Sequence, residues 1–198
     1  PLNLHLTEYK VKTLKDIVGA DPLRSTSGIF LDAENKAIVA SDGYVLVVID
    51  DKSIQETKIV DPKYGELMYF KTNNGVQPKF PDYKAVIPKD NPITFKINMQ
   101  DWMNKTNGVQ RAVQFFYYSG DTTAITVRII VGDVVWFFNA DNINRVLKVF
   151  AENGVTDVTA ELSTPKRAMV FIGKGVMGLV MPIIDSEKIR AFKTIYDS

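Results

Sequence analysis

The stretch VWFFNADNINRVLKVFAENG, residues 135–154, contains the pattern that decides the fold. An apolar run precedes Asn139, whose side-chain oxygen can accept hydrogen bonds from the free N–H groups of a first helical turn. Gly154 supplies the left-handed residue that commonly ends a helix. The stretch therefore predicts a strand followed by a capped helix, with one apolar face formed by Ile143, Val146, Leu147 and Phe150.

The same order of strand, polar cap, helix and closing glycine occurs at three earlier places. An internal repeat sets the architecture before any chemistry is considered. The earlier copies are Leu4-His5-Leu6 with Thr7 and a helix to Val18, closed by Gly19; Lys58-Ile59-Val60 with Asp61-Pro62 and a helix to Asn73, closed by Asn74-Gly75; and Phe95-Lys96-Ile97 with Asn98 and a helix closed by Gly108.

Alternating or β-branched runs between these helices predict strands. They lie at 28–32, 37–40 and 44–50, at 112–119 and 124–131, and at 155–162, 168–173 and 176–181. The unit is thus β-α-β-β-β, and we expect an α+β fold with helices on one face of antiparallel sheets. The second unit is the exception, with room for one short strand at most between Gly75 and Pro92.

Pairing the units predicts two domains. The first is 1–90, with its second half truncated, and the second is 91–185, joined through the proline-containing segment 80–88. In the tail, 186–198, the spacing of Ile189, Phe192 and Ile195 predicts a short amphipathic helix. Packing of this helix on its own domain is favoured over docking to a partner.

Composition bounds the classes of function. The chain has 198 residues, 45% of them hydrophobic and 24% charged, which is ordinary for a globular protein. No apolar run approaches the length of a membrane span, so we expect no membrane partner and a cytoplasmic location. The absence of cysteine excludes disulfides and thiol catalysis, and a net charge of +1 gives no global argument for nucleic-acid binding.

Catalytic motifs are not evident, and we expect neither enzymatic activity nor a cofactor or metal. The one histidine, His5, has no adjacent serine or acid motif and is better explained as a surface residue. No group of histidines and carboxylates has metal-ligand spacing. Gly173-Lys174-Gly175 lacks the rest of a phosphate-binding loop and predicts a hairpin turn instead.

Four short stretches resemble the DNA sliding clamps, in particular the bacterial β subunit of DNA polymerase III. Ala40–Leu46 (ASDGYVL) is similar to the family's A-T-D-G-H-R-L, and 80–88 (FPDYKAVIP) resembles its inter-domain F-P-D-Y-R-R-V-L-P. Leu179–Ile183 (LVMPI) is similar to the family's V-V-M-P-M, and Ile59–Lys63 resembles the entry to a second half-domain. The matches occur in family order within the repeated units.

The resemblance implies a ring whose helices line a central hole and whose sheets lie outside. Clamps with three domains per chain close as dimers and those with two close as trimers, so two domains imply a trimer if a ring forms. The implied partners are duplex DNA and a DNA polymerase or another protein with a clamp-binding motif, and the implied role is that of a non-catalytic processivity factor in replication.

The resemblance also implies a cleft for a short apolar peptide of such a partner. The alternative is that these apolar residues are ordinary core. Tyr44 and Val45 replace the family's histidine and arginine, which removes a cation from the cleft. The implied cleft residues are Ser41, Gly43, Tyr44, Val45, Leu46, Val180, Met181, Pro182 and Ile183.

Duplex DNA in a channel is bound by Lys and Arg that meet phosphates. The predicted helices are barely basic: the first sums to +1 and the others to zero. The candidate DNA-facing residues are Lys12, Lys15, Arg145 and Lys148, and solvated helix faces are the alternative. Two hypotheses follow: a clamp that tethers a partner on DNA, and a degenerate clamp-fold interaction module that does not encircle DNA.

Overall fold

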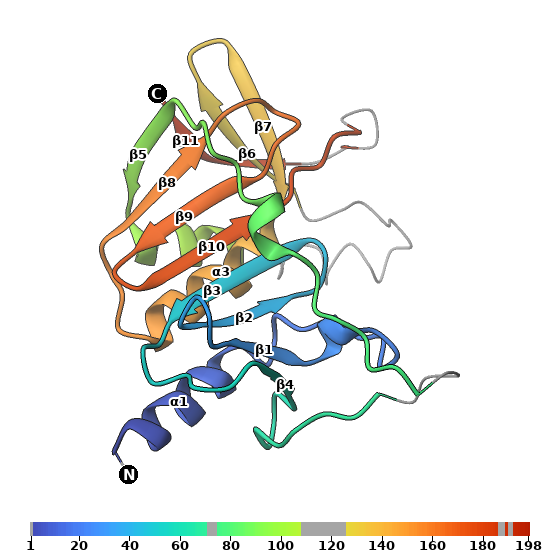
Figure 1. Ribbon diagram of the computed structural model, residues 1–198. Coiled ribbons are helices and arrows are strands. Elements are labelled where there is room, and N and C mark those ends of the chain that lie inside the picture. The colour runs from blue at the N-terminus through green and yellow to red at the C-terminus, as the bar shows by residue number, and fades with distance from the viewer. Residues whose placement is uncertain (1, 71–74, 108–125, 186–188, 190–191) are drawn as a thin grey trace.

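The computed structural model describes residues 2–70, 75–107, 126–185, 189 and 192–198 (Figure 1). Its helical elements are α1 (Leu2–Thr13), η1 (Ser25–Ser27), η2 (Tyr83–Val86), a helix at 99–107, and α3 (Ala140–Glu152). Its strands are β1 (Ile29–Asp32), β2 (Ala37–Ser41), β3 (Val45–Asp50), β4 (Lys58–Val60), β5 (Ile93–Ile97), β6 (Thr126–Val131), β7 (Val134–Asn139), β8 (Val158–Leu162), β9 (Met169–Gly173), β10 (Val176–Val180) and β11 (Phe192–Asp197).

An eight-stranded antiparallel sheet is the centre of the molecule, in the order β4-β1-β2-β3-β10-β9-β8-β5. Its two halves come from distant parts of the chain and meet where β3 pairs with β10, from Val45 opposite Val180 to Ile49 opposite Val176. The α+β fold class predicted from the sequence is confirmed. The predicted domain boundary near residue 90 lies between the two halves of this sheet, and the division into two domains stays a prediction.

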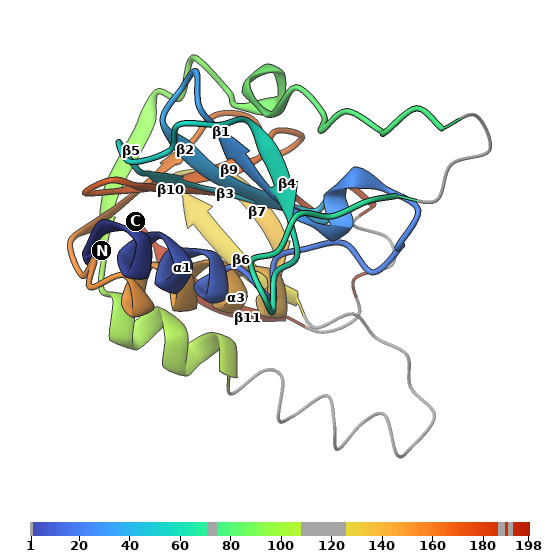
Figure 2. The same ribbon diagram turned by 60° about the horizontal axis from the view of Figure 1, so that its bottom comes forward.

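The two faces of this sheet bury different side chains. Along β3, Val45, Val47 and Ile49 belong to the main core, whereas Leu46 and Val48 belong to a smaller cluster on the other face. This is the period of two that a strand imposes. Figure 2 shows α1, α3 and the helix at 99–107 on one face, with the segment around η2 across the sheet from them.

Local sequence explains why α3 forms where it does. The side chain of Asn139 accepts hydrogen bonds from the N–H groups of Asp141 and Asn142, and Gly154 has a φ of 71° after the last turn. The predicted cap, helix and stop are confirmed. Burial of the predicted apolar face is also confirmed, with Ile143, Val146, Leu147 and Phe150 each 0% exposed.

The helix α3 lies close to β10 because Gly178 has no side chain. A Cβ at this position would lie 2.3 Å from Cγ1 of Val146 and 3.1 Å from Cε2 of Phe150. Real Cβ atoms do not approach other atoms to 2.3 Å. The glycine therefore sets the distance between the helix and the sheet.

The N-terminal unit differs from the prediction. Residues 4–6 are not a strand but part of α1, which ends at Thr13 rather than Val18, with 14–17 forming a turn. A strand needs a partner, and both edges of β1 are already paired, one with β2 and the other with β4. Thr7 does not cap this helix, because it lies inside it and its hydroxyl donates to Asp51 at 2.9 Å.

The predicted helix after β4 is also wrong over the described residues 61–70. The side chain of Asp61 accepts hydrogen bonds from Lys63 and Tyr64, as a cap would, but the chain then reverses. Gly65 has a φ of 70°, and Val60 forms a bridge with Leu67. The left-handed glycine turns the segment back on β4 before a helix can continue.

A second sheet of three strands has the order β11-β6-β7. Its strand β11 replaces the short helix predicted in the tail, so that prediction is wrong. The strand runs parallel to β6 and buries Ile195 to 3% exposure, while Tyr196 stacks on Phe95 at 3.9 Å. The open backbone of β6 outweighs the helical spacing of the tail. The strand predicted at 112–119 lies outside the described residues.

Candidate functional site: an apolar cleft beside the sheet junction

A cleft of about 210 Å³ lies on the sheet face opposite the helices, at the junction of β3 and β10. Three segments form it: the turn between β2 and β3, the segment before and within η2, and the end of β10. Its lining is Thr26, Ser41, Gly43, Tyr44, Val45, Leu46, Phe80, Pro81, Asp82, Tyr83, Val86, Leu179 and Met181.

The first wall is the turn that joins β2 and β3. Asp42 Oδ1 accepts hydrogen bonds from the N–H groups of Tyr44 at 2.8 Å and Val45 at 2.9 Å. Ser41 Oγ donates to the carbonyl of Val45 and accepts from the N–H of Gly43, whose φ is 92°. These bonds fix the turn and leave the Tyr44 side chain 67% exposed at the cleft.

The second wall is the segment at 80–86. Phe80 stacks on Phe30 at 4.9 Å with an interplanar angle of 6°. The buried hydroxyl of Tyr83 donates to Asp32 Oδ2 at 2.9 Å and so ties η2 to the end of β1. The side chain of Asp82 accepts a hydrogen bond from the N–H of Lys84 and caps η2.

The Tyr83–Asp32 contact alters the acidity of both groups. Burial opposes ionisation of Asp32, but hydrogen bonds from Asn35 and Tyr83 outweigh it and lower the pKa of Asp32 below its ordinary value. Burial, followed by the hydrogen bond and negative charge of Asp32, raises the pKa of Tyr83. Tyr83 therefore remains a neutral hydrogen-bond donor to Asp32.

The floor is apolar and spans the sheet junction. Leu46 and Leu179 are directly opposite each other in the β3–β10 pair and are 3% and 2% exposed. Met181 follows β10, donates its N–H to the carbonyl of Tyr44 at 2.9 Å and is 38% exposed. The cleft thus presents apolar side chains that a ligand could still cover.

Six of the nine predicted cleft residues line this cavity: Ser41, Gly43, Tyr44, Val45, Leu46 and Met181. The other three do not. Val180 is 0% exposed in the core on the helix side, while Pro182 and Ile183 pair with β7 through Phe138 and Phe137. Whether the six bind a ligand stays a prediction.

Sequence reasoning missed Phe80, Tyr83, Val86 and Leu179 as cleft residues. Leu179 could have been found from strand alternation, because it is two residues from Met181 and shares its face. The other three lie in the segment that was read as an inter-domain link. Their place in the cleft depends on how that segment folds back over the sheet.

The candidate DNA-facing cations all lie on the helix side of the molecule. Lys12 and Lys15 are exposed near the end of α1. Arg145 is 21% exposed and forms ion pairs with Asp42 at 2.9 Å and Asp141 at 3.3 Å. Lys148 lies 3.6 Å from Asp16 and 3.9 Å from Glu152. Their role toward DNA stays a prediction.

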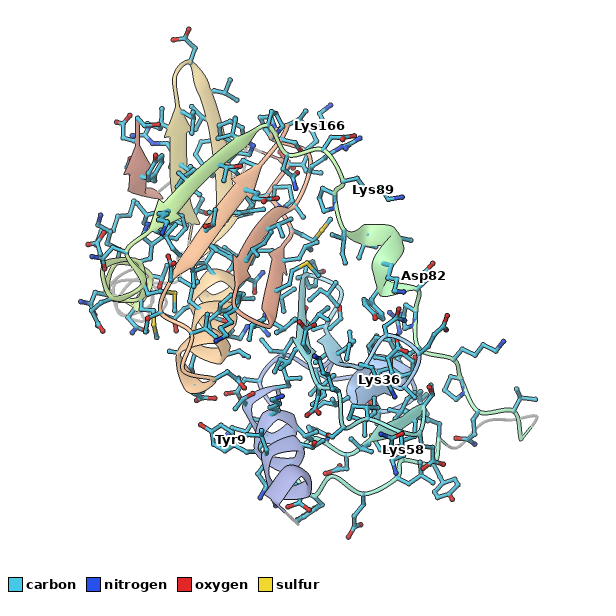
Figure 3. The ribbon with its side chains drawn as sticks, turned by 60° about the vertical axis from the view of Figure 1, so that its left-hand side comes forward. Tyr9, Lys36, Lys58, Asp82, Lys89 and Lys166 are labelled. Atoms are coloured by element: carbon cyan, nitrogen blue, oxygen red, sulfur yellow. The ribbon has the colours of Figure 1, made fainter. Side chains whose placement is uncertain are left out.

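Neighbouring contacts hold α1 and α3 side by side on this face. Arg145 donates to the carbonyl of Asp16 at 2.8 Å, and Asn153 donates to the hydroxyl of Thr13 at 3.0 Å. Tyr9, labelled in Figure 3, donates its hydroxyl to the carbonyl of Glu152 at 2.7 Å. Lys12 at the end of α1 and Lys15 in the turn that follows therefore stand on a fixed surface.

Metal and membrane sites were sought over the described part of the chain. There, no three histidine, cysteine, aspartate or glutamate side chains are placed to hold a metal ion. Nor does any described helix combine the length and apolar character needed to cross a membrane.

Comparison with known proteins supports the architecture rather than the sequence. No protein-family profile and no curated protein sequence matches the chain. Solved structures of bacterial sliding clamps do match, and their superposition covers about 90% of the chain with a probability of 1.00. The chain has the sliding-clamp fold.

Three of these structures illustrate the match. The clamp of Bartonella birtlesii bound to griselimycin has a TM-score of 0.69 at 14% identity, over 90% of this chain and 64% of that one. The clamp of Helicobacter pylori bound to a DNA ligase peptide has 0.62 at 12%, over 90% and 63%. The DNA polymerase III β subunit of Thermotoga maritima has 0.65 at 18%, over 90% and 63%.

In each comparison the superposed region is a larger share of this chain than of the clamp. The chain spans somewhat less than two thirds of the length of the clamps that share its fold. At identities of 10–18% the similarity establishes the sliding-clamp fold alone.

Proposed function

We propose that this chain is a sliding-clamp-like accessory protein of DNA replication or repair, without catalysis of its own, that tethers a polymerase or another partner on duplex DNA. The observation that carries the proposal is the apolar cleft at the β3–β10 junction. In a protein with the sliding-clamp fold, this cleft would receive a short apolar segment of the partner.

Two properties of the cleft support peptide binding. Leu46, Leu179 and Met181 form an apolar floor, and the segment at 80–86 and the Tyr44 turn form two walls around it. Concave apolar sites with a few polar groups are the usual sites for small ligands and peptide anchors. The H. pylori and B. birtlesii clamps, which share the fold, are bound to a DNA ligase peptide and to griselimycin.

Peptide binding is tested with the H. pylori DNA ligase peptide, labelled and titrated by fluorescence anisotropy. Met181→Asp places a charge in the cleft and is expected to abolish binding. The matched control is Ile172→Asp, because Ile172 is 41% exposed against 38% for Met181 and lies on β9 outside the cleft. Equal affinity of Met181→Asp and the wild type would refute this position for the site.

The buried Leu46 offers a second variant of the same cleft. Leu46→Asp is expected to abolish binding as well, although a carboxylate at a residue 3% exposed also costs stability. Its far-ultraviolet circular dichroism and thermal unfolding must therefore be recorded beside its affinity. The more exposed Met181 separates binding from folding more cleanly.

Tethering on DNA would use the helix face. The double variant Lys12→Glu with Lys15→Glu is expected to weaken duplex binding. The slope of log affinity against log salt concentration should fall by an amount that corresponds to about two phosphate contacts. Lys166→Glu with Arg167→Glu is the matched control, because it makes the same change of charge on the cleft side. Equal loss in both variants would show that the helix face is not the DNA surface.

One observation favours a second candidate, a clamp-fold interaction module that does not encircle DNA. Arg145 and Lys148, two of the four candidate DNA-facing cations, are compensated by neighbouring carboxylates. Compensated cations offer less attraction to phosphates. Retained peptide binding without duplex binding at low salt would select this candidate.

A further inference from the structure

A second, larger hollow continues from the apolar cleft. It measures about 500 Å³ and is lined by 85–90, by 166–168 and by Met181. Val86 and Met181 line both cavities, so the two adjoin and are together called the groove. A segment anchored in the apolar cleft can therefore extend into this hollow.

The larger hollow is lined by basic residues, unlike the apolar cleft. Three of its lining residues are cations, Lys89, Lys166 and Arg167, and one is an acid, Asp90. All three cations are exposed, and none forms an ion pair with any residue that the structure describes. On the helix face, by contrast, Arg145 and Lys148 are both paired with carboxylates. The groove thus contains positive charge that is available to a ligand.

Negative and positive side chains also lie at different ends of the groove. The one charged residue that lines the apolar cleft is Asp82, whose carboxylate caps η2. Figure 3 shows Lys89 and Lys166 at one end of the η2 segment and Asp82 at the other. A bound segment therefore meets a carboxylate at one end of the groove and three cations at the other.

We propose that the partner segment carries acidic residues beside its apolar anchors, and that these residues lie over Lys89, Lys166 and Arg167. This inference rests on the proposed function of the apolar cleft. The apolar residues would fill the cleft at Leu46, Leu179 and Met181, and the acidic flank would give specificity. Tyr44 and Val45, in contrast, contribute no charge to the turn wall.

The magnitude expected of such a flank is modest. A single exposed ion pair contributes little to affinity and is screened by salt. Complementary charge acts mainly on the association rate and against wrong partners. Two or three pairs together are expected to change affinity by about tenfold at low ionic strength.

The test uses a phage-displayed library of random dodecapeptides selected on the wild-type protein, with counter-selection on Met181→Asp. Selected peptides are expected to carry Asp or Glu on one flank of their apolar residues. Synthetic copies are then titrated at low and high salt. Their acidic residues are replaced by Asn or Gln in one set and by Lys in another.

The matching protein variant is Lys166→Glu with Arg167→Glu. It is expected to bind the acidic peptides about tenfold more weakly at low salt and to recover affinity for the copies with Lys. Lys174→Glu is the control, because it lies in the turn between β9 and β10, at the far end of that hairpin from Arg167 and Met181.

The outcomes separate this inference from the proposal on which it rests. Peptides that need Met181 but have neutral flanks, and that bind the charge-reversed variant equally well, would overturn the acidic flank alone. If no selected peptide depends on Met181, both the peptide site in the cleft and the acidic flank are refuted. Loss of acidic peptides on charge reversal, with rescue by Lys in the peptide, would support the inference.

Discussion

Arg145 on α3 donates a hydrogen bond from Nη2 to Oδ2 of Asp42 at 2.9 Å, across 103 residues of sequence. The other oxygen of this carboxylate holds the cleft turn through the N–H groups of Tyr44 and Val45. One side chain, 16% exposed, therefore connects the helix that packs under the sheet with the turn that forms the cleft wall. The ion pair therefore also fixes the position of the turn relative to α3.

We expect Asp42→Ala to destabilise the protein by about 1–3 kcal/mol, because it leaves the amides of Tyr44 and Val45 without their acceptor and removes one acceptor of the partly buried Arg145. Asp42→Asn keeps an oxygen for the turn and loses the charge, so its cost should be smaller. Urea denaturation measures both. Peptide affinity should fall in the same order, and an Asn variant as impaired as the Ala variant would contradict this account of the turn.

Gly178→Ala should destabilise the protein by about 1–3 kcal/mol through overpacking. The added methyl group would occupy the space of Val146 Cγ1, 2.3 Å away. Removing that atom with Val146→Ala should recover part of the loss, so the double variant is expected to be more stable than the sum of the single effects. Strict additivity in denaturant unfolding would show that α3 can shift away from β10 at little cost.

The acid stability of the fold should depend on Asp51, which anchors α1 to the sheet. Burial opposes ionisation of Asp51, but hydrogen bonds from Ser53 and Thr7 and the charge of Lys10 outweigh it, so its pKa is lowered. The stabilisation is therefore fully present above the unfolded pKa, about 3.9, and is lost as pH falls through the lower folded pKa.

In that window the free energy of unfolding should rise with pH, and Asp51→Asn should flatten the slope. A slope should remain, because the pKa of Asp32 is also lowered. Unfolding in urea at several pH values from about 2 to about 5 measures this. An unchanged slope in the Asp51→Asn variant would exclude the carboxylate as a source of acid sensitivity.

Ring closure should be visible in the mass of the protein in solution. At the ends of the eight-stranded sheet, residues 66–68 already bond to the outer edge of β4, whereas β5 pairs with no described strand other than β8 and could pair with another subunit. A closed ring of three chains of 22.2 kDa would have a mass of about 67 kDa by light scattering. A monomer at moderate concentration would favour the interaction module over encirclement.

Local signals were sufficient for a large part of the fold. Short apolar runs separated by turn residues predicted β2 and β3 to within a residue or two, and the cap at Asn139 and the stop at Gly154 predicted α3. In each case the residues that decide the structure are neighbours in the chain. Where a strand needed a distant partner, the same reasoning failed, as at residues 4–6 and 192–197.

The cleft shows the same division. The ASDGYVL and LVMPI stretches indicated two of its parts, because they resemble the stretches that form the cleft in the sliding-clamp family. Tyr83 and Phe80 could not be assigned to it, since they are held by Asp32 and Phe30, which lie about fifty residues away in sequence. Lys89, Lys166 and Arg167 could not be grouped from the sequence either, because the segments 85–90 and 166–168 come together only in the tertiary structure.

The sequence by itself determined the α+β class, the capped helix α3 and the alternating strands, because these depend on spacing and on side chains that bond to adjacent backbone. Tertiary structure alone decided that β3 pairs with β10, that the tail forms β11 and that α1 replaces a strand. Those choices depend on which backbone edges remain open once the sheet has formed. The β3–β10 pairing brings the turn after β2 and the end of β10 together, and the contacts of Tyr83 with Asp32 and of Phe80 with Phe30 add the segment at 80–86.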